Sequence, residues 1–282
     1  MKGREDFTNI SEEAARELEA IVGSEYISTD PNICKSSYGQ GWGFELYYMQ
    51  GVSQPPACVV MPKTTEEVAR AVKVCNRYDI PFKVVGSHTV IIADPAFLQN
   101  SVMFDLRRMN HWEIDEKNMY AIVEPAVIAA QLSAEANKRD LYYIITGGGA
   151  PVTPLSNMFS FGWGHLCYRA TPHSTRRVGG IEWVSPEGDI YRFGSLATGD
   201  EWYWGEGLGP QASGLLQGFG CWHGSMGIVT KVSLKLYPFQ PEPMEPEGMG
   251  PNTAVAFPPR LRYYNITFAS KEALSKAQDE IG

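Results

Sequence analysis

Residues 57–89 read ACVVMPKTTEEVARAVKVCNRYDIPFKVVGSHT and contain the clearest pattern in the chain. Residues 57–61 form a short apolar run between prolines, which is typical of a buried strand. Thr64 and Glu67 have the spacing of a helix capping box. The helix that follows has an apolar stripe formed by Val68, Ala71, Val72 and Cys75. Residues 82–85 predict a second strand, so the stretch predicts two parallel strands joined by a right-handed helical crossover.

Helices and strands are expected on both sides of this stretch. Ser11 has the position of a cap for a helix over residues 11–22. A Pro-Glu-Gly turn at residues 186–188 lies between two apolar runs, which predicts a hairpin over residues 181–193. Alternation of apolar and polar residues at 231–236 predicts a half-exposed strand. Further strands are expected at residues 102–105, 120–123 and 263–268, and further helices at residues 128–139 and 271–281.

Composition and charge exclude several classes of protein. Hydrophobic residues make up 44% of the 282 residues, which is ample for a folded core and excludes a disordered chain. The net charge of -8 argues against binding to a nucleic-acid backbone. We find no apolar run long enough to span a membrane, and the acidic first residues do not resemble a secretory signal. The five cysteines lack a metal-binding spacing, so we expect no metal site and reduced thiols in a cytoplasmic protein.

Glycine is concentrated in three loops between expected elements. The first loop, residues 86–89, directly follows a predicted strand, where small residues leave backbone N–H groups accessible to an anion. The second loop spans residues 147–165, and the third spans residues 218–227 immediately before a strand. The three loops are therefore candidate ligand-binding segments, with ordinary turns as the alternative interpretation of each one.

Several motifs, taken in order, resemble one flavoprotein family. They are Pro62-Lys63-Thr64-Thr65-Glu66-Glu67-Val68, the loop at Gly86, Val123-Glu124-Pro125, Gly188-Asp189-Ile190-Tyr191-Arg192 and Gly224-Ser225-Met226-Gly227-Ile228-Val229-Thr230-Lys231. In the order and spacing of these motifs, residues 55–238 resemble the vanillyl-alcohol oxidase and p-cresol methylhydroxylase family. Ser156-Asn157 and Gly162-Trp163-Gly164-His165 most resemble the members that oxidise 4-substituted phenols.

The resemblance implies an α+β fold with an FAD-binding domain of the p-cresol methylhydroxylase type. Such a domain consists of two α+β subdomains with the cofactor between them. We accordingly expect an N-terminal helix and loop at residues 1–54 and the FAD-binding domain at residues 55–238. Its subdomains are expected at about residues 55–112 and 113–238. Residues 239–282 are expected to form a linker and only the start of a cap domain.

The resemblance also implies which residues line the cofactor. The first loop would cradle the FAD pyrophosphate with Val85, Gly86, Ser87, His88, Thr89 and Val90. The other implied cofactor-binding residues are Glu124, Pro125, Ala126, Pro154, Leu155, Ser156, Asn157, Gly162, Gly164, Gly224, Ser225, Met226, Gly227, Ile228 and Val229. Some members carry FAD covalently on a histidine at the position of His88, and a non-covalent role is the alternative.

His165 and Tyr168 are the candidate catalytic residues. Histidine titrates near neutrality and tyrosine binds phenolates or carboxylates, so both are suited to act as a base or a substrate anchor. Solvated loop residues are the alternative interpretation. The phenol-oxidising members have an acidic residue where this chain has Ser160, so their detailed mechanism does not transfer.

The resemblance predicts an FAD-dependent oxidoreductase, or its flavin-bearing subunit, that transfers hydride from an alcohol, a 4-substituted phenol or a hydroxy acid to the flavin. The expected partners are a small organic substrate and a second chain that carries the cap domain or accepts electrons, as in a hetero-oligomer. The alternative to such a second chain is that this sequence is a fragment of a longer protein. The alternatives are an aldonolactone- or glycolate-type oxidase, an electron-transfer or assembly subunit without its own substrate site, and a domain that kept only the fold.

Overall fold

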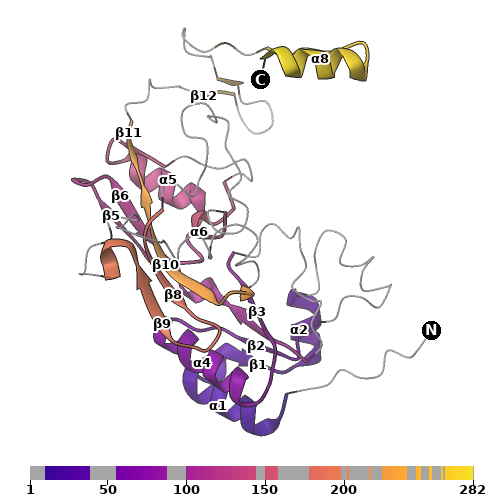
Figure 1. The fold of residues 1–282 in the computed structure, drawn as a ribbon, viewed down its shortest axis with the longest axis vertical. Helices are drawn as coiled ribbons and strands as arrows, with labels where there is room; N and C mark the ends of the chain where they lie inside the picture. The colour runs from indigo at the N-terminus through magenta and orange to yellow at the C-terminus, as the bar shows by residue number, and fades with distance from the viewer. Residues whose placement is uncertain are drawn as a thin grey trace. The chain divides into compact units, whose positions relative to one another are not determined.

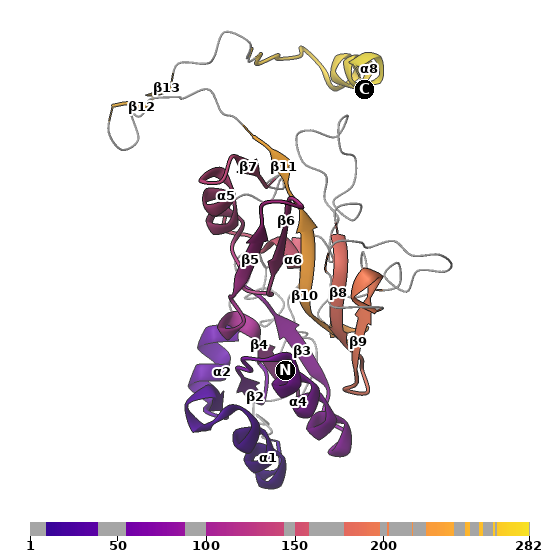
Figure 2. The same cartoon turned by 90° about the vertical axis from the view of Figure 1, so that its left-hand side faces the viewer.

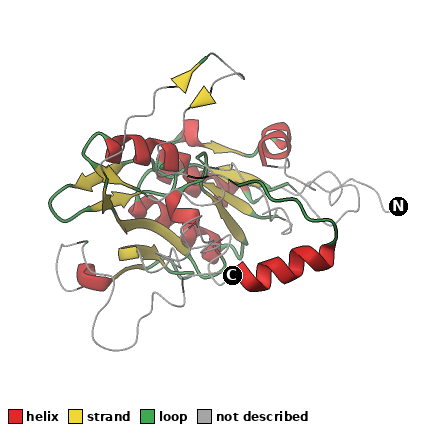
Figure 3. Ribbon diagram, turned by 90° about the horizontal axis from the view of Figure 1, so that it is seen from above, coloured by secondary structure: helices red, strands yellow, loops and turns green. Residues whose placement is uncertain are grey.

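The computed structural model describes residues 10–38, 55–87, 100–143, 150–157, 178–197, 202, 216, 224–239, 246–248, 254–255, 262 and 264–281. The chain divides into two compact units, Met1–Phe239 and Gln240–Gly282. Figure 3 shows that helices and strands both contribute, and the fold is α+β as expected.

The first unit begins with a four-stranded sheet in the order β1-β2-β4-β3 (Figure 1). Its strands are β1 (Ile27–Ser28), β2 (Cys58–Val60), β3 (Phe82–Val85) and β4 (Val102–Asp105). Strands β2 and β3 are both parallel to β4, which confirms the predicted direction of the two strands. Strand β4 lies between them, so the helical crossover passes over a strand instead of joining neighbours.

Two helices, α1 (Glu12–Val22) and α4 (Thr65–Arg77), share a core with one face of this sheet. Both begin at the predicted caps, because Oγ of Ser11 accepts a hydrogen bond from the Ala14 amide and Oγ1 of Thr64 accepts one from the Glu67 amide. Their shared core includes Leu18, Val60, Val68, Val72 and Phe104. The opposite face of the sheet packs on helix α2 (Pro31–Tyr38) through Cys34, Val59, Val85 and Met103.

The second sheet of this unit has five antiparallel strands in the order β5-β6-β10-β8-β9. They are β5 (Trp112–Asp115), β6 (Tyr120–Val123), β8 (Val178–Val184), β9 (Ile190–Phe193) and β10 (Ile228–Lys235). Strands β8 and β9 form the predicted hairpin, in which Val184 pairs with Ile190. In Figure 2 the first sheet is seen with α1, α2 and α4, and the arrowhead of β3 is directed toward the second sheet.

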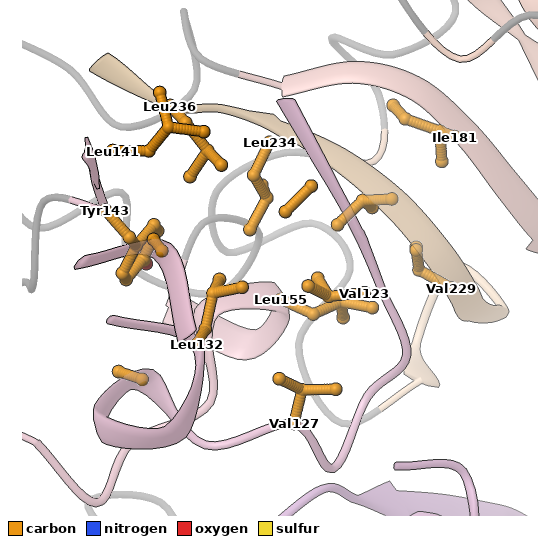
Figure 4. Close-up of a cluster of buried hydrophobic side chains, with 14 of the residues drawn as sticks. Val123, Val127, Leu132, Leu141, Tyr143, Leu155, Ile181, Val229, Leu234 and Leu236 are labelled. Atoms are coloured by element: carbon orange, nitrogen blue, oxygen red, sulfur yellow. The ribbon is translucent and has the colours of Figure 1, made fainter. Parts of the chain in front are cut away.

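One face of the second sheet buries a core with helix α5 (Ala129–Asn137) and the single turn α6 (Pro154–Ser156) (Figure 4). The buried side chains labelled in Figure 4 come from these helices, from the strands and from the segments beside them. A short pair, β7 (Leu141–Tyr142) with β11 (Tyr237–Pro238), extends this part of the unit. The remaining short helices are η1 (Ser24–Tyr26), η2 (Leu106–Arg108) and η5 (Gly194–Ala197).

Strand β10 differs from the half-exposed strand that its sequence predicts. The seven consecutive residues 228–234 of β10 are buried or partly buried, because β10 lies between β6 and β8. The buried hydroxyls are bonded within the protein: Oγ1 of Thr230 donates to the Glu182 carbonyl oxygen, and Oγ of Ser233 donates to the Trp202 carbonyl oxygen. Of the residues that the alternation assigned to solvent, Lys235 is exposed, Lys231 is partly buried and Ser233 is buried with an internal partner.

The second unit contains a short antiparallel pair, β12 (Pro246–Glu247) with β13 (Ala254–Val255), and helix α8 (Lys271–Ile281). The predicted helix at residues 271–281 is confirmed, whereas the predicted strand at residues 263–268 is wrong for the residues described there, 264–268. Tyr264 and Ile266 are 76% and 60% exposed, so the alternating pattern is present without a sheet to bury it. Across the described ranges, no helix has both the length and the apolar character needed to cross a membrane.

Candidate cofactor site

The candidate site is built around Gly86, which directly follows β3. A Cβ atom on this residue would lie 3.0 Å from the carbonyl oxygen of Pro125 and 3.1 Å from Oγ of Ser156. It would also lie 3.6 Å from Oγ1 of Thr153. Three of the segments that the resemblance implies for the cofactor therefore meet here, although up to about 70 residues separate them in the sequence.

Backbone hydrogen bonds hold the segment around Pro125 in place. The Ala126 amide donates to the Met109 carbonyl oxygen at 2.9 Å, and the Glu124 amide donates to the His111 carbonyl oxygen at 3.1 Å. The Glu124 carboxylate in turn accepts a hydrogen bond from the His111 amide at 3.0 Å. Glu124 is thus used to fix the loop to the start of the second sheet.

The segment that contains Ser156 is ordered by a cap. Thr153 is buried, and its Oγ1 accepts a hydrogen bond from the Ser156 amide at 3.3 Å, while Pro154 occupies the first helical position. The Thr153 carbonyl oxygen accepts from the Asn157 amide at 3.1 Å. This Thr-Pro pair is a helix-start signal that the sequence analysis missed, and it positions Oγ1 of Thr153 beside Gly86.

The fourth segment is a tight turn over residues 224–227, which directly precedes β10. The Gly227 amide donates to the Gly224 carbonyl oxygen at 3.0 Å, and the two glycines have φ values of +88° and +83°. A Cβ atom on Gly224 would lie 3.2 Å from Cγ1 of Val84 in β3. The turn therefore packs against β3, the strand that Gly86 follows.

The same turn is fixed to the second sheet through β8. The indole Nε1 of Trp183 donates to the Met226 carbonyl oxygen at 2.7 Å. Gly227 lies against the Val184 carbonyl oxygen, where a Cβ atom would overlap that oxygen and come within 2.6 Å of Nε1 of Trp183. The four segments thus meet where the carboxyl end of a parallel strand approaches the second sheet, the end of such strands at which ligands bind in many α/β folds.

Asn157 carries an unsatisfied polar atom at this place. Its side chain is only 8% exposed, and within the described ranges its Nδ2 has no hydrogen-bond partner. Buried polar atoms are nearly always paired, so an unpaired amide donor at the end of the Thr153 turn requires an explanation. A hydrogen-bond acceptor supplied by a bound ligand is one such explanation.

Next to β3 the sheet holds a buried ion pair that the sequence analysis also missed. Asp105 is fully buried and pairs with Val85 in the ladder between β4 and β3. Its carboxylate accepts from Nε of Arg107 at 2.8 and 3.0 Å and from a terminal nitrogen of Arg107 at 2.5 Å. This forked geometry compensates the buried charge and fixes a half-exposed guanidinium near the end of β3.

The remaining implied residues fall into two groups. Leu155, Ile228 and Val229 are buried in the two apolar cores, so only their backbone groups are left to face a ligand. Residues outside the described ranges are His88, Thr89, Val90, Gly162, Gly164, His165 and Tyr168. The two candidate catalytic residues belong to that second group.

Comparison with known proteins also relates this chain to flavoproteins, as its sequence motifs do. Residues 56–194 match the family model described as an FAD binding domain. The chain is 27% identical over 186 residues to the glycolate oxidase subunit GlcD of Bacillus subtilis, a match that covers 65% of this chain and 37% of that protein. It is also 27% identical over 203 residues to the flavoprotein subunit of the hydroxylating 4-cresol dehydrogenase of Pseudomonas putida, covering 68% of this chain and 37% of that protein.

The fold has solved counterparts. The structure of p-cresol methylhydroxylase with substrate bound superposes with a TM-score of 0.66 at 24% identity, over 83% of this chain and 44% of that one. The chain spans about 37% of the length of the two curated relatives. Residues 56–194 are therefore similar to the FAD binding domain family, and the chain has a fold of the p-cresol methylhydroxylase type.

Proposed function

We propose that this chain binds FAD where its four segments meet and that it is an FAD-dependent oxidoreductase or the flavin-bearing subunit of one. The observation that carries the proposal is the packing of Pro125 and Ser156 around Gly86, with the turn of residues 224–227 beside the same strand. The resemblance to flavoproteins assigned these segments to one cofactor, and they are neighbours in space. Binding by several loops at the end of a sheet suits a large, elongated ligand.

The residues present fit FAD by their chemistry. The lack of a side chain at Gly86 lets the loop after β3 lie against Pro125 and Ser156. The small residue Ser87 follows, and small residues suit a loop whose backbone N–H groups bind a pyrophosphate. The buried Nδ2 of Asn157 is a hydrogen-bond donor that has no acceptor among the described residues, and FAD is rich in phosphate and carbonyl oxygens. Both features suit a ligand that accepts hydrogen bonds, which is what the proposal requires.

The protein groups have defined tasks in this proposal. Residues 85–90 hold the phosphates, and the segments at 124–126, 154–157 and 224–229 line the rest of the cofactor. When bound, the flavin supplies the acceptor for hydride. His165, at the end of the second glycine loop, and Tyr168, three residues beyond it, are proposed to anchor the substrate and take its proton.

The names of the relatives support a substrate with an oxidisable C–H bond beside oxygen or an aromatic ring. Their names include a glycolate oxidase subunit, D-lactate dehydrogenases and a 4-cresol dehydrogenase flavoprotein subunit. We therefore propose a small hydroxy acid, an alcohol or a 4-substituted phenol as substrate. The free and buried state of Cys34, Cys58 and Cys75 supports a cytoplasmic location, where thiols stay reduced.

A second candidate function is a flavin-bearing subunit whose substrate site is completed by another chain. Two of the relatives are named as subunits. Among the described side chains of the second unit, none is fully buried, which supports a contact between this unit and another chain.

Anaerobic reduction of the FAD-loaded protein separates these functions. Glycolate, D-lactate, 4-cresol and a simple alcohol are each added, and the oxidised flavin absorption is followed. Bleaching by one class of compound supports an oxidoreductase and identifies its substrate class. Bleaching by dithionite alone supports the subunit without a complete substrate site. A wild-type chain that does not retain FAD refutes both.

A further inference from the structure

A buried carboxylate connects helix α4 to the second sheet. Glu182, in the middle of β8, is only 4% exposed. Its Oε1 accepts a hydrogen bond from Oγ1 of Thr65 at 2.7 Å, and Thr65 is itself 2% exposed at the first position of α4. The contact therefore joins two buried polar side chains that are 117 residues apart in the sequence.

Two cations compensate the charge of Glu182 from the sheet itself. Nε of Arg192 in β9 donates to Oε2 at 3.1 Å, and Nζ of Lys231 in β10 lies 3.8 Å from Oε1. Oγ1 of Thr230 lies 3.5 Å from the same Oε1. A buried carboxylate with this number of partners has a fixed orientation, because each lost partner would leave charge uncompensated.

Helix α4 makes further contacts with the β8–β9 hairpin, so the Thr65 bond is one end of an extended contact. Near the other end of the helix, Nδ2 of Asn76 donates to the Pro186 carbonyl oxygen at 2.8 Å. Gly188 in the hairpin turn lies so close to Lys73 that a Cβ atom would be 2.7 Å from its Cγ. Thr65 and Glu182 supply the buried polar part of this contact.

The two residues that follow Glu182 hold the turn at residues 224–227. Nε1 of Trp183 donates to the Met226 carbonyl oxygen, and the Val184 carbonyl oxygen packs against Gly227. Val184 and Ile228 also belong to the apolar core of the first sheet. Three consecutive residues of β8 thus contact α4, the turn and the core.

We propose that Glu182 is a positioning residue: its bond to Thr65 sets where β8 lies against α4 and thereby holds the turn of residues 224–227 at its place beside β3. The part of this inference that concerns FAD rests on the proposed function, because the turn is one of the four proposed cofactor segments. The mechanical part, which is the effect of the Glu182–Thr65 bond on the position of the turn, does not rest on the proposed function, since every contact in it lies within the protein. Substituting either member of the pair is expected to loosen the turn without removing any group from it.

The mechanical part is tested by hydrogen–deuterium exchange of the full chain without FAD. Thr65→Val keeps the shape of the side chain and removes the donor, while Glu182 retains both cations. We expect the amides of residues 224–229 and of the first turn of α4 to exchange about tenfold faster in T65V than in the wild type. Thr65→Ser restores the hydroxyl and is expected to exchange at the wild-type rate.

Helix α5 provides the internal reference for exchange. Faster exchange in T65V that is confined to α4, or that is equally large in Ala129–Asn137, would overturn the inference. So would a T65S variant that behaves like T65V, because the hydroxyl would then be irrelevant. Glu182→Gln gives a second variant, with the same expected pattern and a larger increase in exchange.

FAD titration of the same variants tests the dependent part. We expect the dissociation constant for FAD to rise about tenfold in T65V and to be unchanged in T65S. If the wild type itself binds no FAD, the proposed function fails, whereas the exchange result still decides whether Glu182 positions the turn. If wild-type and T65V chains bind FAD equally while exchange differs, the coupling to the cofactor is refuted.

Discussion

Gly86 and Pro125 lie so close that a Cβ atom at residue 86 would be 3.0 Å from the Pro125 carbonyl oxygen. A separation of that size is tighter than ordinary van der Waals contact between a side chain and a carbonyl oxygen. The absence of a side chain at residue 86 is therefore what allows the loop after β3 to lie against the Glu124–Ala126 segment. The site depends on this close approach.

Replacing Gly86 by alanine is expected to weaken FAD binding by about tenfold or more, because Pro125 and Ser156 must move apart to admit the methyl group. Gly180→Ala is the matched control. Its Cβ atom would lie 3.3 Å from Cε3 of Trp202 and 3.4 Å from Cβ of Leu196, a similar crowding at another place on the fold. Fluorescence titration with FAD measures both, and equal losses in the two variants would show that crowding at Gly86 has no special bearing on the cofactor.

Asn157→Leu is expected to separate stability from binding. In the FAD-free protein the variant removes a buried amide nitrogen that has no partner among the described residues, so the free energy of unfolding should stay within about 1 kcal/mol of the wild type or rise. FAD affinity should fall, because the donor proposed for the cofactor is gone. Urea unfolding and FAD titration measure the two effects. A large loss of stability in the FAD-free protein would mean that Nδ2 is already paired inside the protein.

Gly227→Ala is expected to destabilise the fold by about 3 kcal/mol, because it combines a positive φ with overlap of the Val184 carbonyl oxygen. Gly23→Ala is its control. Gly23 has a φ of +90°, and its nearest neighbour to a Cβ atom is Cδ2 of Tyr26 at 3.8 Å, so that variant bears the backbone cost alone. Urea unfolding should show the larger loss for G227A. The reverse order would contradict the packing of the turn against β8.

Stability is expected to fall at alkaline pH because of buried thiols. Burial raises the pKa of Cys34 from 9.0 to about 11 and the pKa of Cys75 from 9.0 to about 12, since a thiolate loses its hydration there. The unfolded chain releases these protons near pH 9, whereas the folded chain keeps them. The stabilisation is therefore complete below about pH 9 and is lost as the pH rises toward the folded-state values.

The measurement is the free energy of unfolding by urea at about pH 8 and about pH 10.5. Each of these thiols is expected to contribute about 1–2 kcal/mol to the decrease. Cys75→Ala removes one thiol, so its decrease between the two pH values should be smaller by that amount. An identical decrease in the variant would show that Cys75 ionises as easily in the folded protein as in the unfolded one.

The sequence predicts this fold best where structure is decided by neighbours in the chain. Ser11 and Thr64 cap their helices as expected because an N-cap depends on the next three residues. The hairpin around residues 186–188 follows from its turn residues in the same way. These local signals identified the elements of the first unit that position the site.

Other features depend on contacts that no local pattern contains. The place of β4 between β2 and β3 is set by the sheet as a whole. The alternating pattern predicts that Ser233 of β10 faces solvent. It is buried instead, and its hydroxyl donates a hydrogen bond to the Trp202 carbonyl oxygen on another segment. Residues 264–268 alternate between apolar and polar side chains but form no strand, since a strand forms only with a partner.

The candidate site was also predicted in part from the sequence and missed in part. The resemblance assigned residues at 86, 125, 156 and 224–227 to one cofactor, and the structure brings their segments together. Thr153 and the Asp105–Arg107 pair adjoin the site but were missed, because a cap and an ion pair gain meaning only from what they lie beside. The resemblance also assigned Asn157, whereas only the structure shows that its buried Nδ2 has no partner among the described residues.

The central claim is that these four segments bind FAD, and gel filtration of the purified chain with added FAD tests it most directly. Protein and flavin absorption are recorded across the protein peak after free FAD has been separated. The account predicts about one FAD for each chain in that peak, and less in the Gly86→Ala variant than in Gly180→Ala. FAD that elutes entirely apart from a folded wild-type chain would contradict it.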